Sequence, residues 1–420
     1  MEWLARSAPG PIRLWAARKA ADRAMHWAAL RGGAEDPYVL ARLGLYGLAA
    51  DRPARDEMTQ FGHLLARASR GEHFAADRLT NDQRRLLART IAPVDADFAS
   101  RLLPEDAQQA RAACLLAMGE TITDRGVAGP AGEREAQALR AAIDVRQGDQ
   151  TAAREAINAM LAIDGVAPIL EPSEASFAIG DLASAELGDV EGPLVLVIIP
   201  YRNAEDTLGH AVRSILMQSW RNIEVLLVDD RSDDRSAAVA RELAEADRRV
   251  RLLENSRTPG VYGARNTAIE AATGDYITFL DADDWSPAER IARQMERLGD
   301  GAVCIANHIR MDEHGAPVAP RVFPIVRMVP ITMLLRRETL LAAGPFEEVP
   351  TGADSEMFAR LEMLHGKSAV RRDPAVLLVA RWRSGSLSDA AEGGMLGAER
   401  EAYRADWMFR HAGLKVPGET

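Results

Sequence analysis

The sequence predicts an α/β protein with a doubly wound mixed sheet, preceded by an all-α domain of helical hairpins. Three observations lead to this prediction. The chain has 420 residues, too many for one ordinary core. Up to about residue 165 it is rich in Ala, Leu and Arg and poor in β-branched runs, which favours helices. From residue 194 onward, short runs rich in Val and Ile alternate with segments of helical apolar spacing, the pattern of an α/β sheet.

The composition is that of a soluble globular protein, with 47% hydrophobic and 27% charged residues. The formal net charge of −11 argues against nucleic-acid binding, which needs a basic surface. No run reaches the ~18 apolar residues of a membrane span, and the amino terminus lacks a signal-peptide pattern. Cys114 and Cys304 both stand among apolar residues, so we expect buried thiols and a reducing, cytoplasmic location.

The composition changes along the chain predict three regions, namely a helical domain, a linker and a sheet domain, over residues 1–166, 167–192 and 193–412. Within the first, Glu135 to Ile163 has the pattern of a helical hairpin that turns at Gly148-Asp149. Its second helix resembles that of a tetratricopeptide-type repeat, although the period of about 34 residues is missing. The simplest interpretation is a scaffold or docking domain for a protein partner.

The amino-terminal residues combine aromatic and basic side chains. Trp3, Trp15 and Trp27 interleave with five basic residues, Arg6, Arg13, Arg18, Lys19 and Arg23. A basic helix with aromatic anchors can lie on an anionic membrane surface. Aromatic side chains more often pack inside a domain, so core packing is preferred, and at most peripheral contact with the inner membrane is expected.

The second half contains four short apolar runs that predict strands. Leu194 to Ile199 is a continuous β-branched run, as expected for a parallel strand covered on both faces. The others are residues 224–228, 250–253 and 276–280. Because ligands of doubly wound sheets bind beyond the carboxyl ends of the strands, we expect the polar residues that follow these strands to meet. They are Tyr201, Arg202, Asn203, Glu205, Asp229, Asp230, Asp281, Asp283 and Asp284.

Three carboxylates follow the last predicted strand in the segment Asp281-Ala282-Asp283-Asp284. Such carboxylates repel one another unless a positive group lies among them. A divalent cation fits, because Mg²⁺ takes one or two protein carboxylates plus substrate phosphates. The alternative is a solvated turn before a helix that starts at Ser286-Pro287. Asp230 can accept from a base N–H or a ribose hydroxyl, and Arg265 and the N–H groups after Pro200 can meet phosphate oxygens.

Together these segments resemble a family 2 glycosyltransferase of GT-A fold, a nucleotide-sugar-binding sheet. The resemblance covers roughly residues 193–390 and rests on four ordered motifs: Val197-Ile198-Ile199-Pro200-Tyr201-Arg202-Asn203-Ala204-Glu205, Val228-Asp229-Asp230-Arg231-Ser232, Gly263-Ala264-Arg265-Asn266, and Gly274 to Asp284. It implies transfer of a sugar from a nucleoside-diphosphate sugar to an acceptor hydroxyl, with inversion at the anomeric carbon and Mn²⁺ or Mg²⁺ on the diphosphate. A cell-surface glycan or glycoconjugate is the expected acceptor.

The same resemblance implies roles for single residues. Asp281 and Asp283 match the Asp-x-Asp pair, with Asp283 as the expected metal ligand and Ala282 between them at the donor. The donor-binding positions are Pro200, Tyr201, Arg202, Asn203, Glu205, Asp230 and Arg265. The family pattern Pro-x-Tyr-Asn is replaced here by Pro-Tyr-Arg-Asn, so either Tyr201 or Arg202 stacks on the base. Relatives often have a metal-binding histidine where this chain has Ala380 to Ser386, so a third metal ligand stays open.

An inverting transfer also needs a general base for the acceptor hydroxyl. Gly352-Ala353-Asp354-Ser355-Glu356 precedes a helical stripe and is similar to the acidic segment that the family has on the acceptor side. Asp354 aligns best as the base, with Glu356 as the second candidate. The alternative is a carboxylate that caps the helix. Arg381-Trp382 lacks the upstream Gln of processive synthases, since Leu378 takes its place, so a single transfer is expected.

Two other functions compete with a transferase. One is a scaffold in which the helical domain binds a partner and the sugar-transfer half is degenerate, although intact Asp281, Asp283 and Asp354 speak against it. The other is a sugar-phosphate nucleotidyltransferase, but its Gly-rich loop after the first strand is missing. Neither the donor sugar nor the acceptor is encoded in a motif, and we expect the loops over residues 307–349 to select them.

Overall fold

The protein is described by a computed structural model that covers residues 8, 10–124, 128–130, 132–170, 179–383 and 397–416. The chain divides into two compact units. The first consists of Met1–Glu120, Pro320–Phe323 and Leu387–Thr420, and the second of Thr121–Ala319 and Pro324–Ser386. No helix among the described residues is long and apolar enough to cross a membrane. Cys114 and Cys304 are buried free thiols, as expected.

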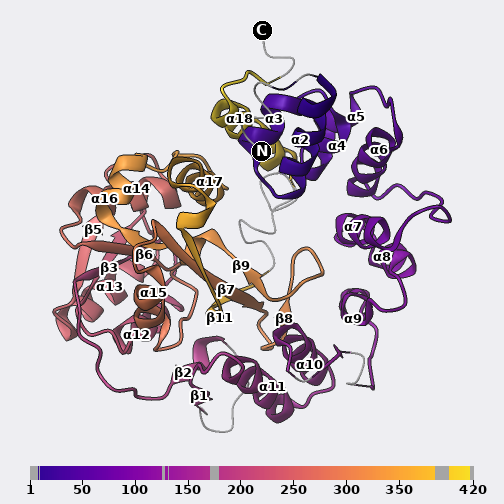
Figure 1. The fold of residues 1–420 in the computed structure, drawn as a ribbon. Coiled ribbons are helices and arrows are strands. Elements are labelled where there is room, and N and C mark those ends of the chain that lie inside the picture. The colour runs from indigo at the N-terminus through magenta and orange to yellow at the C-terminus, as the bar shows by residue number, and fades with distance from the viewer. Residues whose placement is uncertain are drawn as a thin grey trace. The chain divides into compact units, whose positions relative to one another are not determined.

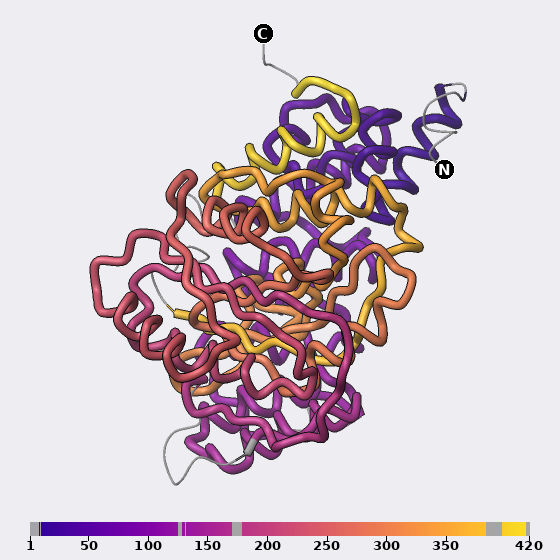
Figure 2. Tube along the Cα trace, turned by 90° about the vertical axis from the view of Figure 1, so that its left-hand side faces the viewer, coloured from indigo at the N-terminus to yellow at the C-terminus, as the bar shows by residue number. Residues whose placement is uncertain are grey.

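The first unit is all-α, and several of its helices start at side-chain caps. Asp36 accepts from the backbone N–H of Val39, and Asp56 and Thr80 form capping boxes. The last helix of the chain joins this unit, where the yellow α18 lies beside the indigo α3 (Figures 1 and 2). The helices are α2 (Gly10–Asp22), α3 (His26–Gly33), α4 (Pro37–Arg42), α5 (Tyr46–Ala50), α6 (Glu57–Ser69), α7 (Asn81–Ile91), α8 (Ala96–Leu102), α9 (Gln108–Ala117) and α18 (Ala398–Ala412).

The second unit begins with the predicted helical hairpin, which is confirmed as α10 (Arg134–Arg146) and α11 (Gln150–Ala162). Gly148 lies between them with φ +82°, where a side chain would strain the backbone. The carboxylate of Glu135 accepts from the backbone N–H groups of Ile325 and Val326 at 2.7 and 2.9 Å. Burial raises the pKa of Glu135. The hairpin is therefore bound to the segment that precedes β9.

The compact units do not separate where the sequence predicted a linker. The hairpin belongs to the unit that contains the sheet, whereas α18 belongs to the helical unit. Within the predicted linker, β1 (Ile169–Leu170) pairs with β2 (Ala183–Ser184), and a 3-10 turn spans Ile179–Asp181. The predicted domain boundaries at residues 166 and 193 remain a prediction.

The main sheet of the second unit is mixed and has the strand order β11-β7-β10-β6-β3-β4-β5. β6, β3, β4 and β5 are mutually parallel, β10 runs antiparallel between β6 and β7, and β11 is parallel to β7. The carboxyl ends of all these strands except β10 therefore meet at one edge. The bounds are β3 (Val195–Tyr201), β4 (Ile223–Asp229), β5 (Val250–Glu254), β6 (Tyr276–Phe279), β7 (Val303–Met311), β10 (Leu334–Arg336) and β11 (Val370–Arg381).

Two short strands, β8 (Pro317–Val318) and β9 (Arg327–Met328), also pair with β7. The helices of the sheet region alternate with the strands, as the periodicity predicted. They are α12 (Leu208–Leu216), α13 (Ser236–Ala246), α14 (Val261–Ala271), α15 (Arg290–Leu298), α16 (Arg337–Ala343) and α17 (Ala353–His365), with 3-10 turns at Pro330–Thr332 and Lys367–Ala369. The expected fold class, a doubly wound mixed sheet preceded by an all-α region, is confirmed.

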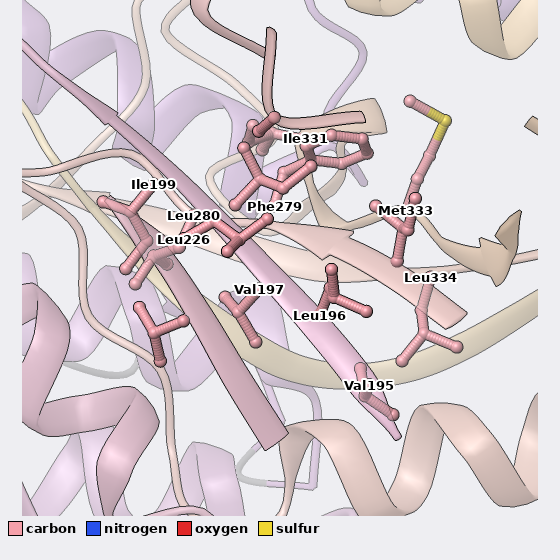
Figure 3. Packing of buried hydrophobic residues seen from close by; sticks show 14 of the residues in the cluster. Val195, Leu196, Val197, Ile199, Leu226, Phe279, Leu280, Ile331, Met333 and Leu334 are labelled. Carbon is pink, nitrogen blue, oxygen red and sulfur yellow. The ribbon is translucent and has the colours of Figure 1, made fainter. Parts of the chain in front are cut away.

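The core of this unit is built around β3, in which every residue is buried. Val195, Leu196 and Val197 pack with Leu226 of β4 and Phe279 of β6 (Figure 3). A strand covered on both faces needs a continuous apolar run, and this is the pattern that the sequence shows from residue 194 onward.

One charged side chain lies inside this core. Arg290, in the first turn of α15, is fully buried. Its guanidinium donates to the Phe279 carbonyl at 2.8 Å and to the Thr278 hydroxyl at 3.1 Å, and also bonds Ser286 and Gln294. Burial lowers its pKa to about 10, and the carboxylates of Asp284 and Asp281 oppose that change. Arg290 therefore places a positive charge beneath the acidic segment that follows β6.

We expect Arg290→Met to lower the free energy of unfolding by about 3 kcal/mol, because it removes the donor to the buried Phe279 carbonyl and leaves the Thr278 hydroxyl only its bond to the Met333 carbonyl. Arg297→Met is the matched control, since Arg297 lies on the exposed side of the same helix. Urea unfolding followed by circular dichroism measures both. Equal stability of the two variants would contradict the assigned role of Arg290.

Candidate active site

The first turns of α14 bring the predicted site residues together, beginning with Asp230. Gly260 precedes this helix with φ +129°, and its backbone N–H donates to Asp230 Oδ2 at 2.8 Å. The amide of Asn255 donates to Asp230 Oδ1 at 2.6 Å. Asp230 is only 4% exposed. Each carboxylate oxygen keeps a second lone pair, so Asp230 is oriented by the protein and can still accept from a ligand.

The loops after β3 and β4 are fastened to each other. Asn203 (φ +48°) accepts from the backbone N–H of Asp233 at 3.0 Å, and Glu205 accepts from the backbone N–H of Arg235 at 2.9 Å. Both side chains therefore hold the loop after β3 against the loop after β4. Tyr201 is buried, and burial together with Asp229 raises its pKa, whereas Arg202 is exposed. This difference in exposure favours Arg202 over Tyr201 as the side chain that a base could reach.

Arg265, one turn further along α14, is a buried cation that pairs with the acidic segment. Its side chain is 4% exposed, and its guanidinium lies 2.8 Å from Asp281 Oδ1. The guanidinium carbon also lies over the rings of Tyr262, Phe279 and Phe346 at 5.4, 5.4 and 5.9 Å. These rings stabilise a desolvated cation through their quadrupoles. The Nε atom of Arg265 is buried without a hydrogen-bond partner.

Tyr262 on the same helix connects Asp354 to this cluster. Its hydroxyl donates to Asp354 Oδ1 at 3.0 Å and accepts from the backbone N–H of Gly352 at 3.0 Å. Burial, and then the charge of Asp354, raise the pKa of Tyr262. Gly352, with φ +93°, is the residue at the N-cap of α17, and no side-chain capping bond is present there. Asp354 is therefore not the capping carboxylate of the alternative interpretation.

Glu356 lies in a different environment from Asp354. It is 1% exposed, and its two oxygens accept from Arg360 Nε at 3.0 Å and Arg360 Nη2 at 2.6 Å. A carboxylate whose two oxygens are both bound by one arginine is less available to a substrate proton, because protonation would leave the guanidinium uncompensated. Between the two predicted bases, this geometry favours Asp354.

The acidic segment after β6 divides into accessible and buried carboxylates. Asp284 is buried and accepts from the backbone N–H of Arg381 at 3.1 Å. Burial, followed by the charges of Asp283 and Asp281, raises its pKa well above the ordinary value. Burial and Asp281 also raise the pKa of Asp283. Arg383, 3.9 Å from Asp283 Oδ2, offsets part of this charge. Asp281 and Asp283 remain the two accessible carboxylates, with 43% and 27% of their side chains exposed.

The residues present fit a divalent cation that a ligand helps to hold. Within the described part of the chain, no three His, Cys, Asp or Glu side chains converge on a common metal position. Two neighbouring accessible carboxylates, Asp281 and Asp283, are nevertheless the donor set that Mg²⁺ or Mn²⁺ uses when substrate phosphates complete its shell. Of the predicted later ligand segment, residues 384–386 lie outside the described residues.

A polar network behind α14 contributes residues that the sequence interpretation missed. Asn266 donates to the Phe346 carbonyl at 2.9 Å and accepts from the Phe346 N–H at 2.9 Å. Glu348 pairs with Arg257 at 2.7 Å and accepts from the Thr258 N–H at 3.3 Å. The network holds the loop before α14 against the segment before α17. Asn266 is the last residue of the Gly-Ala-Arg-Asn motif, a usable signal, whereas nothing in the sequence around Glu348 marked it.

The hydrogen bonds of Glu348 predict that the stability of the fold decreases at low pH. Hydrogen bonds from Thr258, Arg257 and Asn266 hold the pKa of Glu348 at about 2, below its ordinary value of 4.5. A lowered carboxylate pKa stabilises the fold above pH 4.5, and this contribution disappears as the pH falls toward 2. We therefore expect the melting temperature of Glu348→Gln to lie below wild type at pH 6 and to converge with it near pH 2. Thermal melts of both proteins measure this, with exposed Glu338→Gln as control; a constant difference across this pH range would contradict it.

Comparison with known proteins agrees with this geometry. Residues 196–350 match the family Glycosyl transferase family 2. This segment runs from β3 to just before α17 and contains Asp230, Arg265, Asp281 and Asp283. The match to this family therefore covers the part of the second unit in which the motifs were found.

Individual proteins are similar over part of the chain. An uncharacterized glycosyltransferase of Haemophilus influenzae is 38% identical over 123 residues, which is 29% of this chain and 46% of that protein. The Escherichia coli UDP-Glc:alpha-D-GlcNAc-diphosphoundecaprenol beta-1,3-glucosyltransferase WfgD is 39% identical over 105 residues, 25% of this chain and 41% of the relative. The chain thus spans less than half the length of each. The crystal structure of S. aureus TarS 1-349 with UDP-GlcNAc is 16% identical, with a TM-score of 0.39, over 52% of this chain and 71% of that one.

Proposed function

We propose that this protein transfers a sugar from a nucleoside-diphosphate sugar to a hydroxyl group of a cell-surface glycan or glycoconjugate, in a single, inverting, metal-dependent step. The observation that supports this best is the shared attachment of three carboxylates to one helix. Asp230 is bound at the amino end of α14, Asp281 by Arg265 and Asp354 by Tyr262. A donor, its diphosphate and an acceptor would then be recognised by neighbouring parts of one site.

The donor nucleotide is assigned to the carboxyl ends of β3 and β4. Asp230, whose oxygens each retain a lone pair, would accept from the base or the ribose. Exposed Arg202 would stack on the base beside Pro200, while Asn203 and Glu205 hold the loop that forms the wall. Arg265 forms an ion pair with Asp281. Its positive charge would offset part of the negative charge of the acidic segment, which the donor diphosphate would face.

Asp283 and Asp281, on either side of Ala282, would hold Mn²⁺ or Mg²⁺. When bound, such an ion neutralises the diphosphate as it departs. Asp283 is the main candidate ligand, because Asp281 already accepts a hydrogen bond from Arg265 and Asp284 is occupied by the Arg381 N–H.

Asp354 is proposed as the general base. Tyr262 occupies its Oδ1 atom, which orients the carboxylate and leaves Oδ2 to accept a proton. The acceptor hydroxyl would lose that proton to Oδ2 as its oxygen bonds to the anomeric carbon, and the bond from that carbon to the diphosphate oxygen would break on the opposite face. Attack from the face opposite the leaving group inverts the configuration.

The acceptor class rests on the names of relatives. WfgD is named as a glucosyltransferase for a diphosphoundecaprenol-linked sugar, and TuaG of Bacillus subtilis as a putative teichuronic acid biosynthesis glycosyltransferase. Both names refer to surface glycans, so we propose an acceptor of this kind and a cytoplasmic location, with any membrane contact peripheral.

The helical unit would then dock a partner protein. The rival scaffold function is disfavoured by the ordered contacts of Asp230, Asp281 and Asp354.

The role of Asp354 can be separated from its contact with Tyr262. We expect Asp354→Asn to reduce the transfer rate at least about 100-fold while donor binding is retained, because it removes the proton acceptor. Tyr262→Phe removes the same hydrogen bond but keeps the carboxylate, so it should lose far less. Product formation and nucleotide-sugar binding by calorimetry measure the two effects. Equal losses in both variants would reduce Asp354 to a structural partner of Tyr262.

Metal dependence is tested by donor binding. A thermal-shift screen of nucleoside-diphosphate sugars should give stabilisation that requires Mn²⁺ or Mg²⁺ and disappears with EDTA. Asp283→Asn should lose this metal-dependent increment, whereas Asp275→Asn should keep it, because Asp275 is exposed at the opposite end of β6. Stabilisation of the same size with EDTA would exclude Asp283 as a metal ligand in donor binding.

A further inference from the structure

The helical unit contains a group of arginines that no carboxylate neutralises. Arg400 and Arg404 lie four residues apart on α18, so both project from one face of that helix. Arg321 comes from the segment Pro320–Phe323, which is far away in sequence but part of the same compact unit. Tyr46, at the start of α5, interacts electrostatically with both Arg321 and Arg404. We call Arg321, Arg400 and Arg404 the arginine cluster.

The cluster is sheltered from water. Each of its three side chains is only partly exposed, and the Nε atom of Arg321 is fully buried without a hydrogen-bond partner. Arg404 reaches so close to the turn between α4 and α5 that a Cβ at Gly44 would lie 2.8 Å from its Nη1 atom. Buried donors normally find an acceptor, so an orphaned guanidinium N–H indicates a missing partner.

The positive charges of the cluster repel one another, and Tyr46 and Glu401 offset only part of this repulsion. Over the described part of the chain, none of the three arginines forms an ion pair with a carboxylate, in contrast to Arg18 with Asp36 and Asp56 in the same unit. Glu401 is the nearest opposing charge, and its Oε1 atom is already bound by the Gly47 N–H at 2.7 Å. Burial and the neighbouring arginines lower the pKa of Arg404 to about 10, and the same causes lower the pKa of Arg321.

The backbone beside the cluster is also unusual. Val322 has φ +65°, and the Phe323 N–H donates to the Arg321 carbonyl at 2.7 Å, which closes a tight three-residue turn around it. A β-branched residue in this conformation is strained. The strained residue directly follows Arg321, so the backbone beside the cluster is held in a rarely populated conformation.

We propose that the arginine cluster is a binding site for a phosphate-bearing anion, such as a diphosphate group, separate from the candidate active site. Two or more guanidinium groups match the planar, bidentate geometry of phosphate oxygens better than any other common anion receptor. A bound diphosphate would accept from the outer guanidinium N–H groups of the three partly exposed side chains and cancel the repulsion between Arg321, Arg400 and Arg404. The proposal does not depend on the transferase function, because every residue of the cluster lies in the helical unit.

The test uses the full-length protein with sodium pyrophosphate as the probe, in EDTA so that no divalent cation links the probe to the candidate active site. We expect the melting temperature to rise by about 5 °C above that in sodium chloride of equal ionic strength. Hydrogen–deuterium exchange should slow in peptides from α18 and from residues 320–323. Arg321→Gln and Arg400→Gln should lose both effects, whereas Arg410→Gln, which removes an exposed arginine of the same helix, should keep them.

The unliganded variants give a second, independent outcome. Removing one of several cations that repel one another should leave the melting temperature of Arg400→Gln equal to or above that of the wild type. If Arg400 served only to stabilise the fold, its removal would lower the melting temperature. The proposal is overturned if pyrophosphate protects no better than chloride, or if Arg321→Gln and Arg400→Gln respond as wild type does.

The source of the anion is resolved by vesicles of phosphatidylcholine containing phosphatidic acid. Co-sedimentation that Arg321→Gln abolishes would assign the cluster to a lipid headgroup. Pyrophosphate protection without vesicle binding would assign it to a soluble phosphate compound. Either result supports the site.

Discussion

The candidate active site depends on a buried cation, Arg265, at the second turn of α14. Three aromatic rings surround its guanidinium, and its contact at 2.8 Å with Asp281 joins the helix to the acidic segment after β6. Without this ion pair, the carboxylates of Asp281, Asp283 and Asp284 would repel one another with less opposition. The same helix turn presents Tyr262 to Asp354, so one rigid element determines the spacing between the proposed metal site and the proposed base.

Charge balance explains why so acidic a segment can occupy the end of a buried strand. Arg290 lies beneath it in the core, Arg265 contacts it from α14, and Arg383 approaches Asp283 from the end of β11. These cations do not remove the negative charge, because the pKa values of Asp283 and Asp284 remain raised. A partly neutralised carboxylate pair is suited to bind a divalent cation together with phosphates and to release it with the product.

Both units pair arginines with carboxylates, and the arginine cluster departs from this rule. In the sheet unit, Arg257, Arg265 and Arg360 each contact a carboxylate, and these pairs position loops around the site. In the helical unit, the arginine cluster has no such partners among the described residues, although Arg18 nearby has two. A paired arginine is explained by the fold, whereas a sheltered, unpaired group points to a ligand. The helical unit is therefore better described as a second recognition module than as an inert support.

The sequence by itself determined the parallel strands around β3, the hairpin of α10 and α11 and the resemblance of the sheet region to a glycosyltransferase family, and it predicted that Asp230, Asp281 and Asp283 lie at one edge of the sheet. These follow from local periodicity and from the rule that parallel strands end at one edge. The motif already ranked Asp354 ahead of Glu356, but only the tertiary structure supplies a physical reason, namely their different contacts with Tyr262 and Arg360. The same holds for Glu348, for buried Tyr201 against exposed Arg202, and for the meeting of Arg321 with α18. Partners distant along the chain leave no periodic signal, so their contacts appear only once the chain has folded.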